Sequence, residues 1–360
     1  MESKLQQPWW LLSIWSLLVL NLQNGVNAEP QVPCYFIFGD SLSDSGNNND
    51  LQTSAKGNYP PYGIDFPKGP TGRFSNGRNM HDVLVELLGF EEYIFPYVQA
   101  EGKSILKGVN YASGSAGILD ETGSHLGARV SMNEQIKNHK TVISRISKIL
   151  GNDSSTKKLL SQCIYSVQIG GNDFTNNYFK PKFYNTSRQY STPDEFAAVL
   201  VEQYLKQIKA LYDNGARKFA LYGLGEIGCT PDAIATYKPN GFLCASELDN
   251  AATVFNYRLM PLVKELNDKL TDAKISYLNP SPNPAYVAPF VTSGLCCKTG
   301  GGGGELCIPD SIPCSDRSQY AFWDGIHPTD AWNELIAKSA YQTHSPIEAY
   351  PFNIQKLAKQ

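Results

Sequence analysis

The sequence predicts an α/β fold in which a parallel sheet is covered by helices on both faces, and three observations support that prediction. Short apolar runs alternate along the chain with segments that show helical periodicity. The runs are almost continuously apolar, as strands buried on both faces are. Three of them lead directly into turns rich in Gly, Asn, Asp and Ser, at the strand ends where such sheets bind their ligands.

The four apolar runs are the predicted strands. They lie at residues 34–38, 163–169, 219–222 and 275–278. The first ends in Gly39-Asp40-Ser41, the second in the turn 170–173 and the third in the turn 223–225. Because the carboxyl ends of parallel strands share one edge of the sheet, we expect these turns to lie together.

Three long helices are predicted between the strands. They lie at residues 132–150, 192–215 and 246–270. In the second, Thr192 is the expected N-cap, Pro193 takes the first helical position and Glu195 completes a capping box. Apolar residues recur at helical spacing until Gly215 ends the helix. No internal repeat or domain linker interrupts the pattern, so residues 29–360 are predicted to form one domain.

The N-terminal residues have the pattern of a secretory signal peptide. Lys4 supplies a positive charge, residues 8–20 are an apolar core, and the small residues Val26 and Ala28 fit a cleavage site after Ala28. We therefore expect residues 1–28 to be removed on secretion. The apolar core is too short for a membrane span, which takes roughly 20 residues. An uncleaved signal anchor is the alternative, and no later stretch is predicted to span a membrane.

Composition excludes some classes of function. The chain is 42% hydrophobic and 18% charged, with a formal net charge of −3. These values are ordinary for a globular protein, and no basic stripe predicts a nucleic-acid partner. Nothing in the sequence requires a metal or another cofactor, and none is expected. The oligomeric state cannot be predicted from these features.

Eight cysteines can be oxidised in a secreted protein. We expect a Cys229–Cys244 disulfide and two further bridges within a cluster whose internal pairing is left open. The cluster contains Cys296, Cys297, Cys307 and Cys314. A zinc site is the alternative, although adjacent cysteines lack the usual C-x-x-C spacing. Cys34 and Cys163 lie in apolar runs and are predicted to be buried free thiols.

Two sequons predict glycosylation sites. Asn152 and Asn185 each begin an N-x-S/T triplet in a polar, loop-like stretch. Both are therefore candidate acceptors if the protein is secreted.

Ser41 is the candidate nucleophile because it follows the first predicted strand directly. A serine hydroxyl needs a base to take its proton. His327 is the candidate base, since Asp324 lies three residues before it and a turn would bring its carboxylate onto one imidazole nitrogen. The four other histidines lack this pattern; they are His81, which is expected to be structural, and His125, His139 and His344.

Ordinary turn chemistry is the alternative explanation of these residues. Gly-Asp-Ser is a common turn sequence, and an Asp three residues from a His occurs often by chance. The G-x-S-x-G elbow occurs nowhere in the chain, which argues against an ordinary α/β-hydrolase.

Two further turns supply candidate donors for an oxyanion. Gly114 offers a backbone N–H that no side chain blocks, and Asn172 offers a side-chain amide. Together with the backbone N–H of Ser41 they would make an oxyanion hole, in which one donor is typically worth about 2.7–4 kcal/mol. Gly117 is close to Gly114 and is the alternative glycine.

Six segments carry a resemblance to a known family. In chain order they are FGDSLSDSGNN (38–48), GRFSNGR (72–78), GVNYASG (108–114), GGND (170–173), GEIGCTP (225–231) and FWDGIHPT (322–329). In these segments the chain resembles the plant GDSL esterase/lipase family of the SGNH hydrolases, from about residue 34 to 340. The resemblance implies a three-layer α/β/α sandwich with a flavodoxin-like parallel sheet.

The resemblance also implies a function and a set of roles. Ser41 would be the nucleophile, His327 the base and Asp324 its orienting partner, with Ser41, Gly114 and Asn172 at the oxyanion. The implied activity is hydrolysis of a carboxylic ester through an acyl-enzyme, in a secreted protein of the cell wall or apoplast. An acyltransferase with a non-water acceptor is the first alternative, and a secreted binding or defence protein without turnover is the second. A lipid, an acetylated polysaccharide and a phenolic ester all remain open as substrates.

Overall fold

The computed structural model describes residues 29–238, 243–281, 283–300 and 305–360. Within it, Gln31–Gln360 forms one compact unit. The predicted signal peptide and the glycines at 301–304 lie outside the described residues.

A five-stranded sheet lies at the centre of this unit, in the order β1-β2-β3-β4-β7. The first four strands are parallel and β7 is antiparallel to β4. The strands are β1 (Tyr35–Gly39), β2 (Ile164–Gln168), β3 (Lys218–Tyr222), β4 (Lys274–Leu278) and β7 (Ala349–Tyr350). The four predicted strands are therefore confirmed.

An extended segment runs beside β1 on the edge away from β2. The Ile37 N–H donates to the Val109 carbonyl at 3.1 Å, and the Tyr111 N–H donates to the Ile37 carbonyl at 2.8 Å. This segment follows β1 in the chain and lies outside it in the sheet. If the segment is numbered 2 and β1, β2, β3 and β4 are numbered 1, 3, 4 and 5, the spatial order is 2-1-3-4-5, which is the flavodoxin-like order. The order reverses at β1, and sheets of this kind form their ligand crevice at that switch point.

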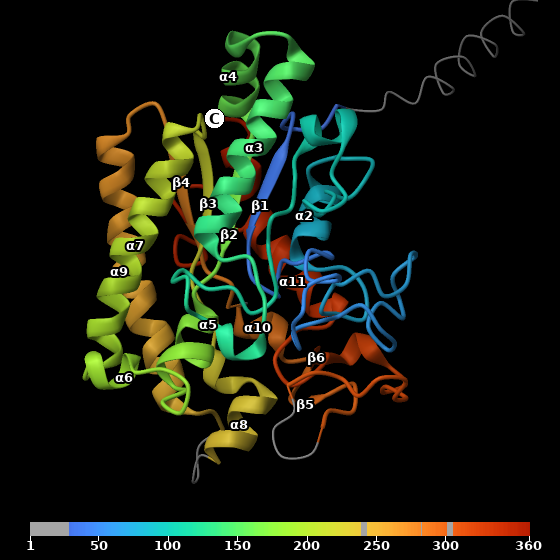
Figure 1. Cartoon of the computed structure of the whole chain (residues 1–360). Helices are drawn as coiled ribbons and strands as arrows, with labels where there is room; N and C mark the ends of the chain where they lie inside the picture. The colour runs from blue at the N-terminus through green and yellow to red at the C-terminus, as the bar shows by residue number, and fades with distance from the viewer. Residues whose placement is uncertain (1–28, 239–242, 282, 301–304) are drawn as a thin grey trace, which may run out of the picture. The chain divides into compact units, whose positions relative to one another are not determined.

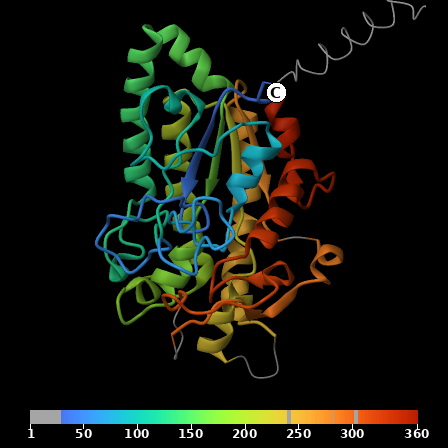
Figure 2. The same ribbon diagram turned by 90° about the vertical axis from the view of Figure 1, so that its right-hand side faces the viewer.

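Helices cover both faces of the sheet, which confirms the three-layer sandwich. One layer holds α3 (Met132–Leu150), α7 (Pro193–Asp213) and α9 (Ser246–Lys269), and the other holds α2 (Met80–Leu87), α11 (Asp330–Gln342) and α12 (Ile354–Ala358). Figure 2 shows the sheet edge-on between the two layers. Shorter elements are α4 (Asp153–Gln162), α5 (Gly171–Asp173), α6 (Thr186–Gln189), α8 (Pro231–Tyr237), α10 (Pro284–Val287), β5 (Val291–Leu295) and β6 (Tyr320–Phe322).

Helix α7 begins and ends at the predicted signals. The Thr192 hydroxyl accepts from the Glu195 N–H at 3.2 Å, and Pro193 fills the first turn. The Glu195 carboxylate accepts from the Ser191 N–H at 2.8 Å and not from the N–H of the N-cap Thr192. The reciprocal bond of the predicted capping box is therefore made to the residue before the N-cap. Gly215, at a φ of +107°, lies just past the helix end.

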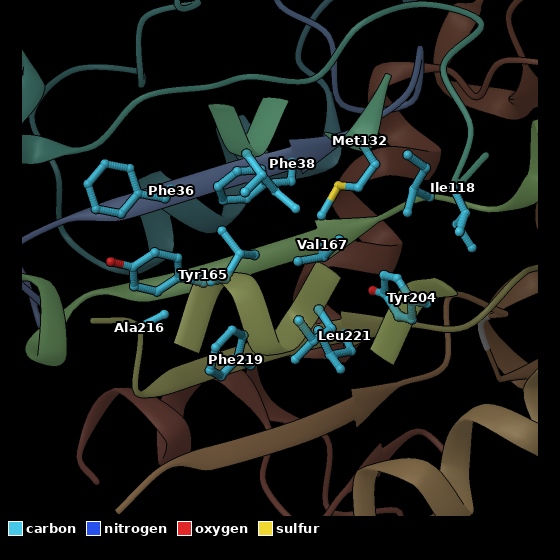
Figure 3. Close-up of a cluster of buried hydrophobic side chains, with 14 of the residues drawn as sticks. Phe36, Phe38, Ile118, Met132, Tyr165, Val167, Tyr204, Ala216, Phe219 and Leu221 are labelled. Atoms are coloured by element: carbon cyan, nitrogen blue, oxygen red, sulfur yellow. The ribbon is translucent and has the colours of Figure 1, made fainter. Parts of the chain in front are cut away.

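The strands are largely apolar because both of their faces are buried. Phe36 and Phe38 of β1 belong to the cluster between the sheet and α3 and α7 (Figure 3). The alternating residues Tyr35 and Ile37 belong to the cluster under α2, α11 and α12. A strand with two buried faces has no side that favours polar residues through contact with solvent, which explains the nearly continuous apolar runs.

The prediction of free thiols at Cys34 and Cys163 is wrong, because these two residues form a disulfide. They directly precede β1 and β2, whose first residues Tyr35 and Ile164 are paired in register. Parallel pairing therefore places their Cα atoms 4.8 Å apart, within the usual range for a disulfide. The partners are separated by 129 residues, so only the strand register reveals the pair.

Removing the Cys34–Cys163 bridge is expected to lower the free energy of unfolding by about 2–5 kcal/mol, because it closes a very long loop. The double variant Cys34→Ala/Cys163→Ala, unfolded in denaturant, measures the loss. Ester hydrolysis should persist under native conditions, since the bridge lies at the opposite end of β1 from Ser41. An unfolding free energy equal to that of the wild type would contradict the bridge.

Candidate active site

Ser41 lies on a tight turn at the carboxyl end of β1. The Asp40 carbonyl accepts from the N–H groups of Ser43 and Asp44, at 3.1 and 2.9 Å, and the Asp40 side chain accepts from the Leu42 N–H at 3.0 Å. The turn leaves Ser41 partly exposed. Its own backbone N–H donates to no acceptor in the described part of the chain.

The three residues of the candidate triad are brought into one hydrogen-bonded line. The Ser41 Oγ atom lies 2.8 Å from Nε2 of His327. The His327 Nδ1 atom lies 2.8 and 3.0 Å from the two carboxylate oxygens of Asp324. Asp324 is fully buried and His327 almost so. A hydroxyl, an imidazole and a carboxylate in this order can move the hydroxyl proton to the imidazole.

A turn brings the side chains of Asp324 and His327 together. Oδ1 of Asp324 accepts from the backbone N–H groups of Ile326 and His327, at 2.9 and 2.7 Å. This folds the segment back so that the imidazole meets the carboxylate. With Nδ1–H donated to Asp324, Nε2 is left as the acceptor for the Ser41 hydroxyl.

The surroundings of His327 favour its protonated form. Burial alone lowers the pKa of His327, but the charge of Asp324 and its hydrogen bond outweigh burial and raise this pKa above its ordinary value. The ring of Phe74 lies against the imidazole, with centroids 4.8 Å apart. The imidazole is therefore held in place and is a stronger base than an isolated histidine.

Tyr62 also forms a hydrogen bond with Asp324, and the sequence did not predict this contact. Its hydroxyl donates to Oδ2 of Asp324 at 2.6 Å and accepts from the Cys307 N–H at 3.1 Å. The side chain is buried. No local pattern marks Tyr62, because it lies 262 residues away from Asp324 in the chain.

Asn172 is the second residue of α5, and its side-chain amide is oriented by two neighbours. Its Nδ2 donates to the Ala116 carbonyl at 3.0 Å, and its Oδ1 accepts from Asn176 at 2.8 Å. An amide nitrogen carries two hydrogens. The second N–H of Asn172 has no acceptor among the described residues.

The structure corrects the expectation for Gly114. Its N–H donates to the buried carboxylate of Asp44 at 3.0 Å and is not available to a substrate oxygen in this conformation. Gly117 does not replace it. The Ala116 carbonyl accepts from Asn172, and in a trans peptide the Gly117 N–H points the opposite way.

Comparison with known proteins gives the family. The family model described as GDSL-like lipase/acylhydrolase matches residues 35–340. The chain belongs to this family. A GDSL esterase/lipase of Arabidopsis thaliana is 48% identical over the full length of both chains. Two others from the same plant are 45% and 46% identical, over 97% and 95% of this chain and 98% and 96% of their own. The protein is a carboxylic ester hydrolase.

Two buried aspartates of the family motifs fix the loops around the candidate site. Asp44 accepts from three backbone N–H groups, those of Gly46, Asn47 and Gly114. Asp173 accepts from the N–H groups of Ile118 and Leu119 and from the Thr122 hydroxyl. Burial raises the pKa of both carboxyls to about 6. They fix the turns that carry Gly114 and Asn172.

The cysteine cluster supports the segment that carries Asp324. The bridges are Cys296–Cys314 and Cys297–Cys307, and they settle the pairing that the sequence left open. The N–H groups of Cys296 and Cys297 both donate to the Trp323 carbonyl, next to Asp324. Cys307 in turn holds Tyr62. The bridged loop therefore positions the carboxylate of the candidate triad from two sides.

The remaining candidates are not members of the candidate triad. Cys229 and Cys244 are bonded to each other and lie near Asp249, so their sulfurs are not available as zinc ligands. Asn152 and Asn185 are both exposed. In the described residues, no helix has the length and apolar character to cross a bilayer.

Two of the other histidines are buried hydrogen-bonding residues. Nε2 of His81 lies 3.0 Å from the Ser43 hydroxyl, and Nδ1 of His139 lies 3.0 Å from the Tyr111 hydroxyl. Burial lowers the pKa of both histidines to about 3. Each therefore stays neutral.

Proposed function

We propose that this esterase works through an acyl-enzyme on Ser41, with His327 as general base and Asp324 as its orienting partner. The observation that carries the proposal is the 2.8 Å contact between the Ser41 hydroxyl and Nε2 of His327, with Asp324 on the opposite nitrogen. Serine becomes a nucleophile when such a base takes its proton.

The steps follow from this geometry. Oγ of Ser41 attacks the ester carbonyl while its proton passes to Nε2 of His327. The imidazolium is stabilised by the buried Asp324 carboxylate, which Tyr62 also holds. His327 then gives the proton to the departing alcohol. Water, deprotonated by the same imidazole, attacks the acyl-enzyme, and Ser41 leaves with the proton returned to it.

The oxyanion of each tetrahedral intermediate is assigned to two donors. They are the backbone N–H of Ser41 and the uncommitted N–H of Asn172, both at the switch point of the sheet. Gly114 is not proposed as a donor in this conformation, because Asp44 occupies its N–H.

Replacing Asn172 with alanine is expected to lower kcat about 10²–10³-fold, as the loss of one oxyanion donor does. KM should change little, because the bond forms fully only in the transition state. Asn172→Asp is the matched variant, since it keeps the shape and removes the N–H donors. Wild-type kcat in both variants on p-nitrophenyl acetate would contradict the assignment.

Labelling with a fluorophosphonate tests the triad directly. Peptide mass spectrometry should find the adduct on Ser41, and His327→Ala should abolish labelling because the hydroxyl loses its base. An adduct on a different serine would refute the proposal.

The protein is further proposed to be secreted, with residues 1–28 as its signal peptide and residues 29–360 as one domain. The charged, apolar and small residues at the N-terminus support this. Four disulfides fit an oxidising compartment such as the cell wall or apoplast. Exposed Asn152 and Asn185 are the proposed glycosylation sites.

A further inference from the structure

A π-helical turn, Phe174–Tyr178, follows α5 directly. Turns of this kind are rare in proteins and are found frequently at functional sites. Within the turn, the backbone of Asn176 departs from helical geometry, with φ at −117° and ψ at 20°. The residue is 3% exposed, so its polar side chain has to find its partners inside the protein.

The side chain of Asn176 holds the oxygen end of the Asn172 amide. Nδ2 of Asn176 donates to Oδ1 of Asn172 at 2.8 Å, while Nδ2 of Asn172 donates to the Ala116 carbonyl at 3.0 Å. The χ2 torsion of an asparagine has broad minima, so a single hydrogen bond leaves the amide plane free to rock. Two bonds at opposite ends of the amide define its plane, and with it the direction of the second N–H.

The backbone of Asn176 is tied to the same loop that carries Ala116. Its carbonyl accepts from the Gly123 N–H at 3.3 Å. Gly123 has a φ of +74°, and a Cβ atom at this position would collide with the Ser115 carbonyl. Both partners of the Asn172 amide therefore belong to one closely packed unit, formed by the loop 115–123 and the π-helical turn.

The side chain of Asn176 forms no second hydrogen bond within the described part of the chain. Its Oδ1 atom is buried and accepts from no donor there. Leaving a buried acceptor unpaired costs stability, and a leucine of similar shape would avoid that cost. What the asparagine provides in return is the single bond to Asn172.

We propose that Asn176 is a positioning residue of this esterase, which fixes the Asn172 amide so that its second N–H points at the developing oxyanion. The inference rests on the proposed function, which assigns Asn172 as an oxyanion donor. Such donors are effective because they are oriented before the reaction and need no reorganisation during it. An amide that rocks would lose part of this advantage in the transition state and little in the ground state.

The next residue in the chain supplies a matched control. Asn177 lies in the same π-helical turn and is fully buried, but its side chain bonds Thr122 and Thr186 instead. Asn177→Ala removes buried hydrogen bonds of the same kind without touching the Asn172 amide. It therefore separates a general disturbance of the turn from a loss of orientation at Asn172.

A double-mutant cycle tests the proposal, with kcat and KM measured on p-nitrophenyl acetate. Asn176→Ala should lower kcat about 10–100-fold and leave KM within about twofold, a smaller loss than in Asn172→Ala because the Ala116 carbonyl still holds the amide. In the Asn172→Ala background, adding Asn176→Ala should lower kcat by no more than about twofold, since no amide is left to orient. Asn177→Ala should keep kcat within about threefold, with the same effect in both backgrounds.

A second readout does not depend on turnover. A trifluoromethyl ketone forms a tetrahedral adduct with a nucleophilic serine, and its Ki should rise in Asn176→Ala by about the factor by which kcat/KM falls. If thermal unfolding shows Asn176→Ala to be misfolded, Asn176→Leu takes its place with the same expectations.

Two results would overturn the inference and leave the proposed function standing, provided that Asn172→Ala itself loses activity. One is a wild-type kcat in Asn176→Ala. The other is an equal loss of kcat in both backgrounds, which would make Asn176 a purely structural residue. A wild-type kcat in Asn172→Ala would instead remove the proposed oxyanion donor, and the role of Asn176 with it.

Discussion

Ser41→Ala is expected to lower kcat for p-nitrophenyl acetate by on the order of 10⁴-fold or more. The variant removes the oxygen atom that is proposed to form the acyl-enzyme, while the contact between His327 and Asp324 is left intact. Ser41 is partly exposed, so the free energy of unfolding should change by no more than about 0.5 kcal/mol. Hydrolysis assays at saturating substrate measure kcat, and thermal unfolding measures the change in stability.

Ser43 supplies the matched control two residues further along the same turn. It is fully buried, and its hydroxyl bonds Nε2 of His81 and Oε1 of Gln168. Ser43→Ala should therefore cost about 1–3 kcal/mol of stability, because it leaves buried polar partners unpaired, but it should retain hydrolysis. The assignment of Ser41 fails if Ser41→Ala keeps more than a small fraction of wild-type kcat, or if Ser43→Ala is the variant that abolishes it.

Asp324→Asn is expected to lower kcat about 10³–10⁴-fold and to move the pH dependence. The base must be neutral, so wild-type kcat/KM should fall as pH drops through the pKa of His327. Asp324 raises this pKa above the ordinary value of a histidine. The acidic limb of the profile, where kcat/KM falls as pH drops, should therefore lie above that value. Asparagine removes the negative charge. The limb of the variant should therefore shift to lower pH, because neutral His327 persists there.

The measurement is kcat/KM for an alkyl ester by continuous titration of the released acid across the neutral range. Tyr62→Phe is the control, since it removes one hydrogen bond to Asp324 and keeps the charge. It should lose far less kcat than Asp324→Asn and keep its limb at the wild-type position or above. A limb that stays in place in Asp324→Asn would show that the titrating group is not His327.

Most regular elements could be predicted because their signals are local. The run Tyr35–Gly39 is buried on both faces, and continuous apolarity is the direct consequence of that environment. Thr192, Pro193 and Gly215 end up at the two ends of α7, since capping involves only residues a turn apart. Asp324 and His327 meet for the same reason, through a turn three residues long.

Contacts between distant segments could not be predicted in this way. The Cys34–Cys163 bridge depends on the register of β1 and β2, and the Tyr62 contact depends on a loop from the far end of the chain. The N–H of Gly114 was expected to be available, but its direction is decided by Asp44, which lies 70 residues earlier. A cavity of about 600 Å³ is lined by residues that follow β1, β2, β3 and β4, and no local sequence pattern predicts it.

The sequence by itself determined the fold class, the positions of the strands and long helices, and the family to which the chain belongs. This was possible because the periodicity of apolar residues, the helix-capping residues and the family motifs each involve only a few neighbouring residues. The tertiary structure alone decided which cysteines pair, that Tyr62 donates to Asp324, and that Asp44 accepts from the Gly114 N–H. Those features depend on the distance and direction between groups from different segments, which are defined only once the sheet has its register and the helices are packed upon it.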